Sequence, residues 1–111
     1  MIKSVPEKLG DILQAGKVTI FSVSYCSYCK TALSILQKLK IDFQHLECDT
    51  ENLSSQQIAD LHELSGFRTY PKIFVSKNCI GGCDDLRSKI ASGKFYDLLA
   101  AEKIEYTKAK L

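Results

Sequence analysis

The fold is decided by residues 18–30, which read VTIFSVSYCSYCK. The run opens with β-branched and aromatic residues, which predicts a strand over 18–23. Two cysteines, Cys26 and Cys29, follow with two residues between them. Apolar residues then recur every three to four positions, which predicts a helix from about 27 to 40. This spacing places Cys26 at a strand-to-helix turn and Cys29 one turn inside the helix, as a redox site requires.

Length and composition indicate one ordinary globular domain. The 111 residues are 45% hydrophobic, enough to bury a core without disulfides. The net charge of +2 and the scattered lysines do not indicate nucleic-acid binding. No stretch is apolar over the length of a bilayer and residues 1–7 lack a signal-peptide pattern, so we expect a cytoplasmic protein without a membrane partner. The odd number of cysteines, five, argues against an extracellular disulfide framework.

The segment before residue 18 has the pattern of a helix. Ser4 and Glu7 have capping-box spacing. Leu9, Ile12 and Leu13 form an apolar stripe behind them. We therefore expect an opening helix that ends before the first strand.

The chain after residue 40 is predicted to complete a layered α/β domain. Its patterns indicate three strands, over about 42–48, 72–75 and 79–80. They indicate three helices, over about 54–65, 84–90 and 95–99. The simplest arrangement is a four-stranded mixed sheet flanked by helices on both faces, with the first two strands parallel and the last two in a hairpin. We expect residues 103–111 to form a loosely held tail.

Three motifs on this topology resemble one family. They are Tyr25-Cys26-Ser27-Tyr28-Cys29, Arg68-Thr69-Tyr70-Pro71 and Gly81-Gly82-Cys83-Asp84-Asp85. In this order they look like a dithiol glutaredoxin of the thioredoxin-fold superfamily. A single Cys-x-x-Cys pair is shared with zinc knuckles and thioredoxins, whereas the three motifs together are specific. The resemblance implies a single glutaredoxin domain over 1–111, with a core of about 16–102.

The resemblance also implies an activity, glutathione-dependent thiol–disulfide exchange. Cys26 is then the nucleophile and Cys29 the resolving thiol. The implied partners are glutathione as co-substrate, protein disulfides and glutathionylated proteins, with the protein acting as a monomer. Positions that match the family's glutathione site are Tyr28, Arg68, Thr69, Tyr70, Cys83 and Asp84, and Pro71 matches its cis proline.

The exchange chemistry requires a thiolate at Cys26. An ordinary thiol with a pKa near 8.5 is mostly protonated at neutral pH. A helix N-terminus stabilises an anion by about 0.3 to 1 kcal/mol, so we expect the Lys30 ammonium, four residues on, to add to it. Cys29 is shielded one turn inside the helix, and its spacing lets it release a mixed disulfide from Cys26.

Glutathione is an extended anionic tripeptide, which suggests a site made of backbone pairing and charge capture. The residue before a proline is held extended, so Tyr70 can offer its backbone like an edge strand. Gly82 precedes a predicted helix start, where free N–H groups suit a carboxylate. We expect Asp84 to bind the ligand's amine and Arg68 or Lys30 its other carboxylate.

Three residues depart from the family pattern. Val23 stands where glutaredoxins often carry a lysine, which removes one cation near the nucleophile. Ser27 replaces the common proline between the cysteines and restores an N–H there. Tyr70 replaces the usual valine before the proline, and its ring is expected to narrow the groove or stack on a substrate.

Parts of this sequence pattern also occur in proteins with other functions. Ser27 favours an iron-sulfur carrier, in which two chains share a 2Fe-2S cluster through Cys26 thiolates and two glutathiones, so that a dimer forms only with the cluster. A zinc site is disfavoured because Cys79 and Cys83 fall within a hairpin and a Gly-Gly turn. Thioredoxin-like reduction by a flavoprotein is disfavoured by the Gly-Gly-Cys-Asp-Asp turn.

The remaining cysteines and the histidines have plainer interpretations. We expect Cys48 and Cys79 to be small core residues. Cys83 borders the predicted site. His45 and His62 are isolated in the sequence, and we expect both on the surface.

Overall fold

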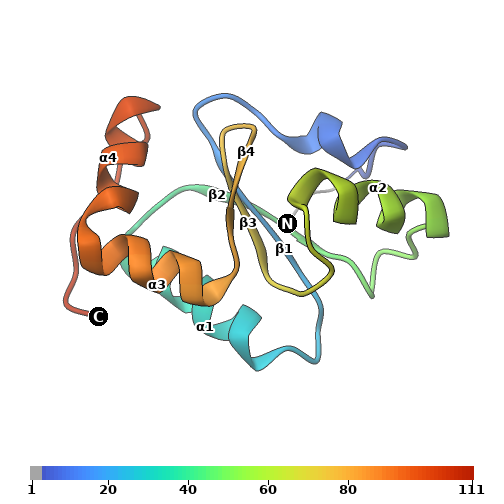
Figure 1. Ribbon diagram of the computed structural model, residues 1–111, viewed down its shortest axis with the longest axis horizontal. Coiled ribbons are helices and arrows are strands. Elements are labelled where there is room, and N and C mark those ends of the chain that lie inside the picture. Colours follow the sequence, from blue (N-terminus) through green and yellow to red (C-terminus); the bar gives the residue numbers. More distant parts are fainter. Residues whose placement is uncertain (1–3) are drawn as a thin grey trace.

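The computed structural model describes residues 4–111 and shows one mixed sheet with helices on both faces (Figure 1). The strands are β1 (Val18–Ser22), β2 (Phe43–Glu47), β3 (Lys72–Val75) and β4 (Asn78–Gly81). The helices are the 3-10 helix η1 (Leu9–Ile12), then α1 (Ser27–Lys38), α2 (Ser55–Ser65), α3 (Cys83–Ser92) and α4 (Lys94–Ala101). Residues 1–3, and the part of the predicted domain that they form, lie outside the described residues.

The sheet has the strand order β2-β1-β3-β4. β1 runs parallel to β2, with Val18 opposite Phe43, because α1 returns the chain to the same end of the sheet. β1 runs antiparallel to β3, with Ile20 opposite Ile73, and β3 continues into the antiparallel strand β4. This confirms the predicted mixed sheet and its thioredoxin-type layering.

The central strand β1 divides the core into two clusters. All five of its residues are buried, because helices cover both faces of the sheet (Figure 1). Side chains alternate along a strand, so Ile20 joins the cluster with Leu36 of α1, whereas Phe21 joins the cluster with Leu61 of α2. The β1–α1 turn is thereby held between two packed layers.

Helix α2 begins and ends as its sequence predicts. The Ser54 hydroxyl accepts the Gln57 N–H at 3.1 Å, and the Gln57 side chain accepts the Ser54 N–H at 2.8 Å. Gly66 takes a left-handed conformation with φ 84° and donates its N–H to the His62 carbonyl. The capping box and the glycine stop confirm the prediction for this helix.

The predicted opening helix is wrong in extent. Only η1 forms there, and its N-cap residue, Lys8, has no capping side chain. A 3-10 turn places residues three apart on one face, so this single turn suffices to bury Leu9 and Ile12 against α2. The capping-box spacing of Ser4 and Glu7 is not used.

The segment after α4 packs on the domain. Ile104 is 8% exposed and belongs to the core cluster of α1. The Thr107 N–H donates to the Leu39 carbonyl at 2.7 Å, and the Tyr106 ring stacks on Tyr96 with centroids 5.1 Å apart. These contacts differ from the loosely held tail that the sequence suggests. Among the described residues, no helix is long and apolar enough to cross a bilayer.

Candidate active site

The two cysteines of the Cys-x-x-Cys motif meet at the start of α1. Cys26 is the N-cap residue, with an extended backbone at φ −107° and ψ 111°, and it is half-buried. Cys29 is only 1% exposed, and its backbone N–H donates to the Cys26 sulfur at 3.1 Å. The arrangement confirms that the pair is close, and it aims a helix N-terminal donor at the more exposed sulfur.

The two thiols differ in the extent of their burial. Burial, with a smaller effect of the adjacent Cys26 sulfur, raises the pKa of Cys29 to about 12. Cys29 is therefore a neutral thiol at physiological pH. Cys26, in contrast, lies at the surface and its sulfur is 3.7 Å from the Tyr70 carbonyl oxygen. The reactive turn thus touches the loop before β3.

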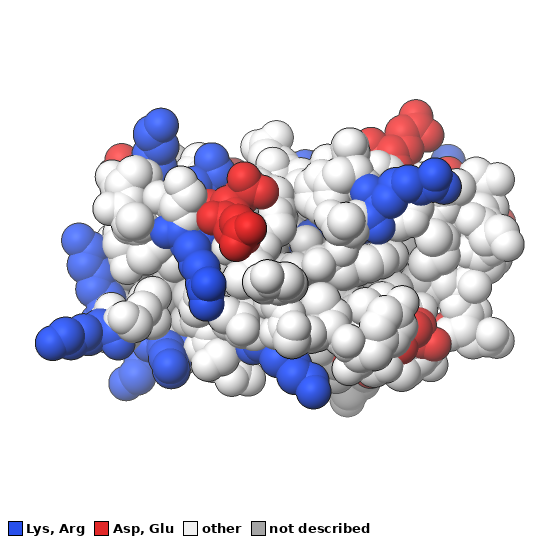
Figure 2. All heavy atoms as spheres, turned by 60° about the horizontal axis from the view of Figure 1, so that its bottom comes forward, with Lys and Arg blue, Asp and Glu red and all other residues white. Residues whose placement is uncertain are grey.

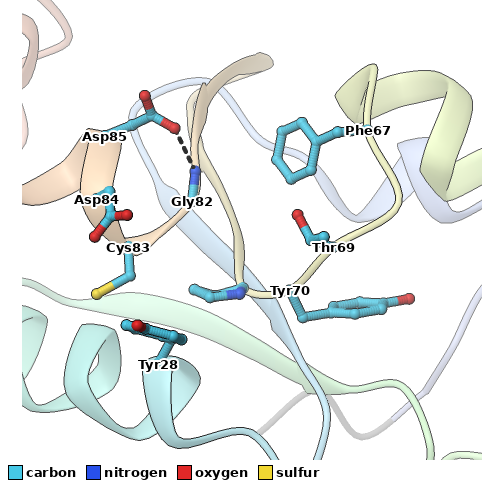
Figure 3. A pocket seen from close by; sticks show the side chains of 9 residues that line it. Tyr28, Phe67, Thr69, Tyr70, Gly82, Cys83, Asp84 and Asp85 are labelled. Carbon is cyan, nitrogen blue, oxygen red and sulfur yellow. Dashed lines mark hydrogen bonds between the residues drawn. The ribbon is translucent and has the colours of Figure 1, made fainter.

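A cavity of about 410 Å³ lies between the first turns of α1 and α3 and the loop before β3 (Figure 3). This is within the size range of small-molecule sites. All the residues predicted to bind glutathione, except Lys30 and Arg68, line it: Tyr28, Thr69, Tyr70, Pro71, Gly82, Cys83 and Asp84. Three separate segments of the sequence therefore converge on one cavity.

The loop before β3 forms one wall of this cavity. The Tyr70–Pro71 peptide bond is cis, which confirms the prediction for Pro71. A Cβ atom on Gly82 would lie 3.3 Å from the Pro71 carbonyl oxygen, so a larger residue would crowd this contact. The Phe67 ring lies across the cavity from Cys83, whose sulfur points toward Tyr28 (Figure 3). Phe67 also lines the cavity and was not predicted.

The start of α3 forms the other wall, with one difference from expectation. The Gly82 N–H is not free, because it donates to the Asp85 carboxylate at 3.0 Å (Figure 3). The other donors that open α3 without an intrahelical acceptor are the N–H groups of Cys83, Asp84 and Asp85. Asp85, a further lining residue that was not singled out, is thus a helix cap.

The two predicted cations do not line the cavity. Successive helical residues turn by about 100°, so Lys30 points to the face of α1 opposite Tyr28. The i,i+4 argument for Lys30 does not apply, because Cys26 has an extended backbone and lies outside the helix. Lys30 instead lines a second cavity, between α1 and α3. Arg68 is exposed on the loop before β3 without lining the first cavity.

The Tyr70 ring does not narrow the groove. It is half-buried and points away from Gly82 and Cys83 (Figure 3). Its centroid is 6.1 Å from that of His62 and 5.0 Å from the Lys72 nitrogen. Only the backbone of Tyr70 faces the reactive sulfur.

Behind the cavity wall lies a buried lysine that the sequence analysis missed. The Lys72 ammonium is fully buried and donates to the Ser65 hydroxyl at 2.9 Å and to the Phe67 carbonyl. It also lies 4.4 Å from the centroid of the Phe67 ring. Burial lowers the pKa of Lys72 to about 8. The sequence feature that could have indicated this residue is a lysine at the start of an otherwise apolar strand.

A second missed residue fixes the turn that carries Cys26. The Asp49 carboxylate accepts the Ser24 N–H at 2.9 Å and also the Ser24 hydroxyl. These hydrogen bonds lower the pKa of Asp49. Asp49 follows β2, so only the parallel pairing of β1 with β2 brings it to this turn.

The other cysteines are mostly as predicted, whereas the histidines are not. Burial raises the pKa of Cys48 to about 11, and Cys79 is half-buried, as expected of core residues. His45 is half-buried with its Nε2 2.6 Å from the Ser22 hydroxyl. His62 has a buried Nδ1 with no hydrogen-bond partner among the described residues. His45 lies in β2 and His62 in α2, and both are half-buried, whereas surface positions were predicted.

Comparison with known proteins gives the family. The glutaredoxin family model matches residues 18–80. Glutaredoxin-C2 of Arabidopsis thaliana is 39% identical over 93 residues, which are 84% of each chain. Glutaredoxin-1 of Homo sapiens is 42% identical over 85 residues, 74% of this chain and 80% of that one. The crystal structure of a buckwheat glutaredoxin–glutathione complex is similar with a TM-score of 0.71 and 31% identity, covering 78% of each chain. The chain therefore belongs to the glutaredoxin family of glutathione-dependent thiol oxidoreductases.

Proposed function

We propose that this chain reduces protein disulfides and glutathione mixed disulfides, with Cys26 as nucleophile, Cys29 as resolving thiol and glutathione as co-substrate. The main support is the hydrogen bond from the Cys29 N–H to the Cys26 sulfur, 3.1 Å long. A donor at a helix N-terminus favours the sulfur anion, which is the nucleophile in exchange. The other support is the cavity beside this pair.

For a glutathione mixed disulfide, the reaction needs only Cys26. Its thiolate attacks the glutathione sulfur, the new Cys26–glutathione disulfide forms, and the target thiolate leaves and takes up a proton. A second glutathione thiolate then attacks the glutathione sulfur of this disulfide. Oxidised glutathione leaves, and the Cys26 thiolate is restored.

For a protein disulfide, the reaction also needs Cys29. Attack by Cys26 leaves a mixed disulfide with the substrate. Cys29 then loses its proton and attacks the Cys26 sulfur, which releases the reduced substrate and leaves a Cys26–Cys29 disulfide. Two glutathiones reduce that disulfide and leave as oxidised glutathione. The raised pKa of Cys29 keeps it protonated until this step.

The cavity supports glutathione as the thiol. The Tyr70 carbonyl lies beside the Cys26 sulfur, where an extended peptide can pair with the backbone. The opening N–H groups of α3 suit a carboxylate, and the exposed Asp84 carboxylate suits an amine. The similar buckwheat protein is described as a complex with glutathione.

The division of labour is tested with Cys26→Ser and Cys29→Ser. We expect Cys26→Ser to lose turnover of both a glutathione mixed disulfide and a protein disulfide. We expect Cys29→Ser to keep the first activity and to lose the second, because only the second needs a resolving thiol. Initial rates of glutathione oxidation measure both. Equal rates of protein-disulfide reduction by Cys29→Ser and the parent would contradict the assignment.

The iron-sulfur carrier is a second candidate, favoured by Ser27. This residue is exposed at the first position of α1 and leaves the rim beside Cys26 without a proline ring. Within residues 4–111, no group of three or more His, Cys, Asp or Glu side chains is arranged to hold a metal ion. A 2Fe-2S cluster therefore needs ligands from a second chain and from glutathione. Visible absorbance and dimer formation in an anaerobic preparation support the carrier, and a colourless, active monomer contradicts it.

The protein targets, the monomeric state without a cluster and the cytoplasmic location stay predictions. Sedimentation of the reduced protein tests the oligomeric state. Fractionation of cells that express the chain tests the location.

A further inference from the structure

A second cavity continues the cleft between α1 and α3. It measures about 640 Å³, against about 410 Å³ for the first cavity. The first cavity uses the opening turns of the two helices, at Tyr28 and Cys83. The second uses the turns that follow, residues 30–38 of α1 and 87–91 of α3. Both cavities therefore lie between α1 and α3, so a substrate bound at the first can extend along these helices toward the second.

This α1–α3 groove combines an apolar floor with a basic rim. The floor contains Ile35 and Ile90, and the rim contains the exposed side chains of Lys30, Lys38 and Arg87. None of the described residues that line it is acidic. Figure 2 shows basic side chains gathered over the left half of this face, where α1, α3 and α4 lie in Figure 1. The groove thus suits a ligand that is both apolar and anionic.

Among residues 4–111, none of the rim cations forms an ion pair. Between residues 4 and 111, the single ion pair joins Lys17 to Asp42, at 3.6 Å. Three cations around one groove attract an acidic ligand and repel a basic one.

We propose that the α1–α3 groove binds the acidic and apolar segment next to the reactive cysteine of a protein substrate. This rests on the proposed function, because the substrate is a protein in mixed disulfide with the glutathione that Cys26 attacks. Glutathione occupies the first cavity, and the protein part of the mixed disulfide extends along α1 and α3. The groove then selects substrates by binding, and the exchange at sulfur is unchanged.

Three probes test this selection. Two are glutathionylated peptides of equal length with one cysteine, flanked in one by Asp, Glu and Leu and in the other by Lys and Leu. The third is the mixed disulfide of glutathione with cysteamine, which has no flanking residues. We expect the parent to have a kcat/KM about tenfold higher for the acidic peptide than for the basic one at low salt. The difference should shrink as salt screens the charges.

The groove variant is the double substitution Lys38→Glu and Arg87→Glu. It should lower kcat/KM for the acidic peptide by about tenfold and raise that for the basic peptide. Turnover of the cysteamine disulfide should not change, since neither residue lines the first cavity. The control is Lys77→Glu with Lys94→Glu, which makes the same change of charge at exposed positions outside the groove.

Several outcomes would overturn the proposal. One is equal turnover of the two peptides by the parent. Another is an equal effect of the groove and control variants, which would assign the selection to net charge. Binding of phosphatidylserine vesicles that only the groove variant abolishes, without peptide selection, would assign the groove to a lipid surface. Absence of turnover even for the cysteamine disulfide would instead refute the proposed function.

Discussion

At the scale of single residues, the site depends on where each side chain lies relative to water. Cys26 and Cys29 are the same residue type three positions apart, yet one is half-exposed and the other buried. Burial raises the pKa of the Cys29 thiol, whereas the Cys26 sulfur lies at the helix start and accepts the Cys29 N–H. One turn of helix thus gives the two thiols different surroundings.

Lys72 supplies a prediction at this scale. Its buried ammonium donates to the Phe67 carbonyl and the Ser65 hydroxyl. These bonds fix the position of Phe67, which lines the first cavity. Its pKa is lowered from 10.5 to about 8 in the folded state. Between these two pH values the unfolded chain binds one more proton than the folded protein, so this residue makes the free energy of unfolding rise with pH.

The prediction is tested with Lys72→Met, which removes this titration. Relative to Lys72→Met, the parent should gain about 3 kcal/mol of unfolding free energy between pH 8 and pH 10.5. The buried thiols act in the opposite direction at high pH, but the main cause of their raised pKa is burial, which is the same in both proteins. Urea unfolding at several pH values measures it. Lys77→Met, at an exposed position, is the control, and a pH-independent difference for Lys72→Met would contradict the assignment.

At the scale of secondary-structure elements, the helices differ in the group that caps their N-terminus. α1 starts at a thiol, α2 at a serine and α3 at a glycine whose N–H is capped by Asp85. Two of these starts, those of α1 and α3, line the first cavity, and at α1 the Cys29 N–H donates to the Cys26 sulfur. At the start of α2, the backbone N–H groups of the capping box already have side-chain acceptors, so this helix start contributes to the stability of the fold.

The capping box gives a prediction for α2. Ser54→Ala removes the acceptor for the Gln57 N–H and should lower the free energy of unfolding by about 1 kcal/mol. Turnover of a glutathione mixed disulfide should be unchanged at a temperature where both proteins are folded. Denaturant unfolding measures the loss. Ser55→Ala, at the next exposed position, is the matched control and should change stability by less than about 0.5 kcal/mol.

At the scale of the whole molecule, the sheet brings together residues far apart in the sequence. Cys26, the loop before β3 and the start of α3 meet because β1, β3 and β4 are neighbours in the sheet. The segment after α4 closes the same core, through Ile104 and the Thr107 N–H. The domain therefore includes residues that the sequence analysis placed in a tail.

The role of that segment is tested with Ile104→Ala. The substitution should lower the free energy of unfolding by about 2 kcal/mol or more, since it leaves a cavity beside α1 and α4. Thr107→Ala is the control, because the Thr107 side chain is exposed and its backbone N–H still reaches the Leu39 carbonyl. Thermal or denaturant unfolding measures both. Equal stability of Ile104→Ala and the parent would support a loosely held tail instead.

The sequence by itself determined what depends on local pattern. The run at 18–30, the Ser54–Gln57 box and the Gly-Gly turn specify elements through periodicity, capping and backbone freedom, which act over a few residues. The mixed sheet with its parallel first pair and final hairpin followed from these patterns, and most of the residues predicted to bind glutathione line one cavity. The local sequence pattern did not predict the extent of the opening helix, because this extent depends on packing against α2, which is a long-range contact.

The tertiary structure alone decided the details that depend on distance and burial. It kept Lys30 and Arg68 out of the lining of the first cavity, used the Gly82 N–H within the protein, and directed the Tyr70 ring away from Gly82 and Cys83. It also brought Asp49 to the Cys26 turn and buried Lys72 without a carboxylate partner among the described residues. The Ser24–Asp49 contact joins residues 25 positions apart, and no local pattern encodes which segments meet over such a separation.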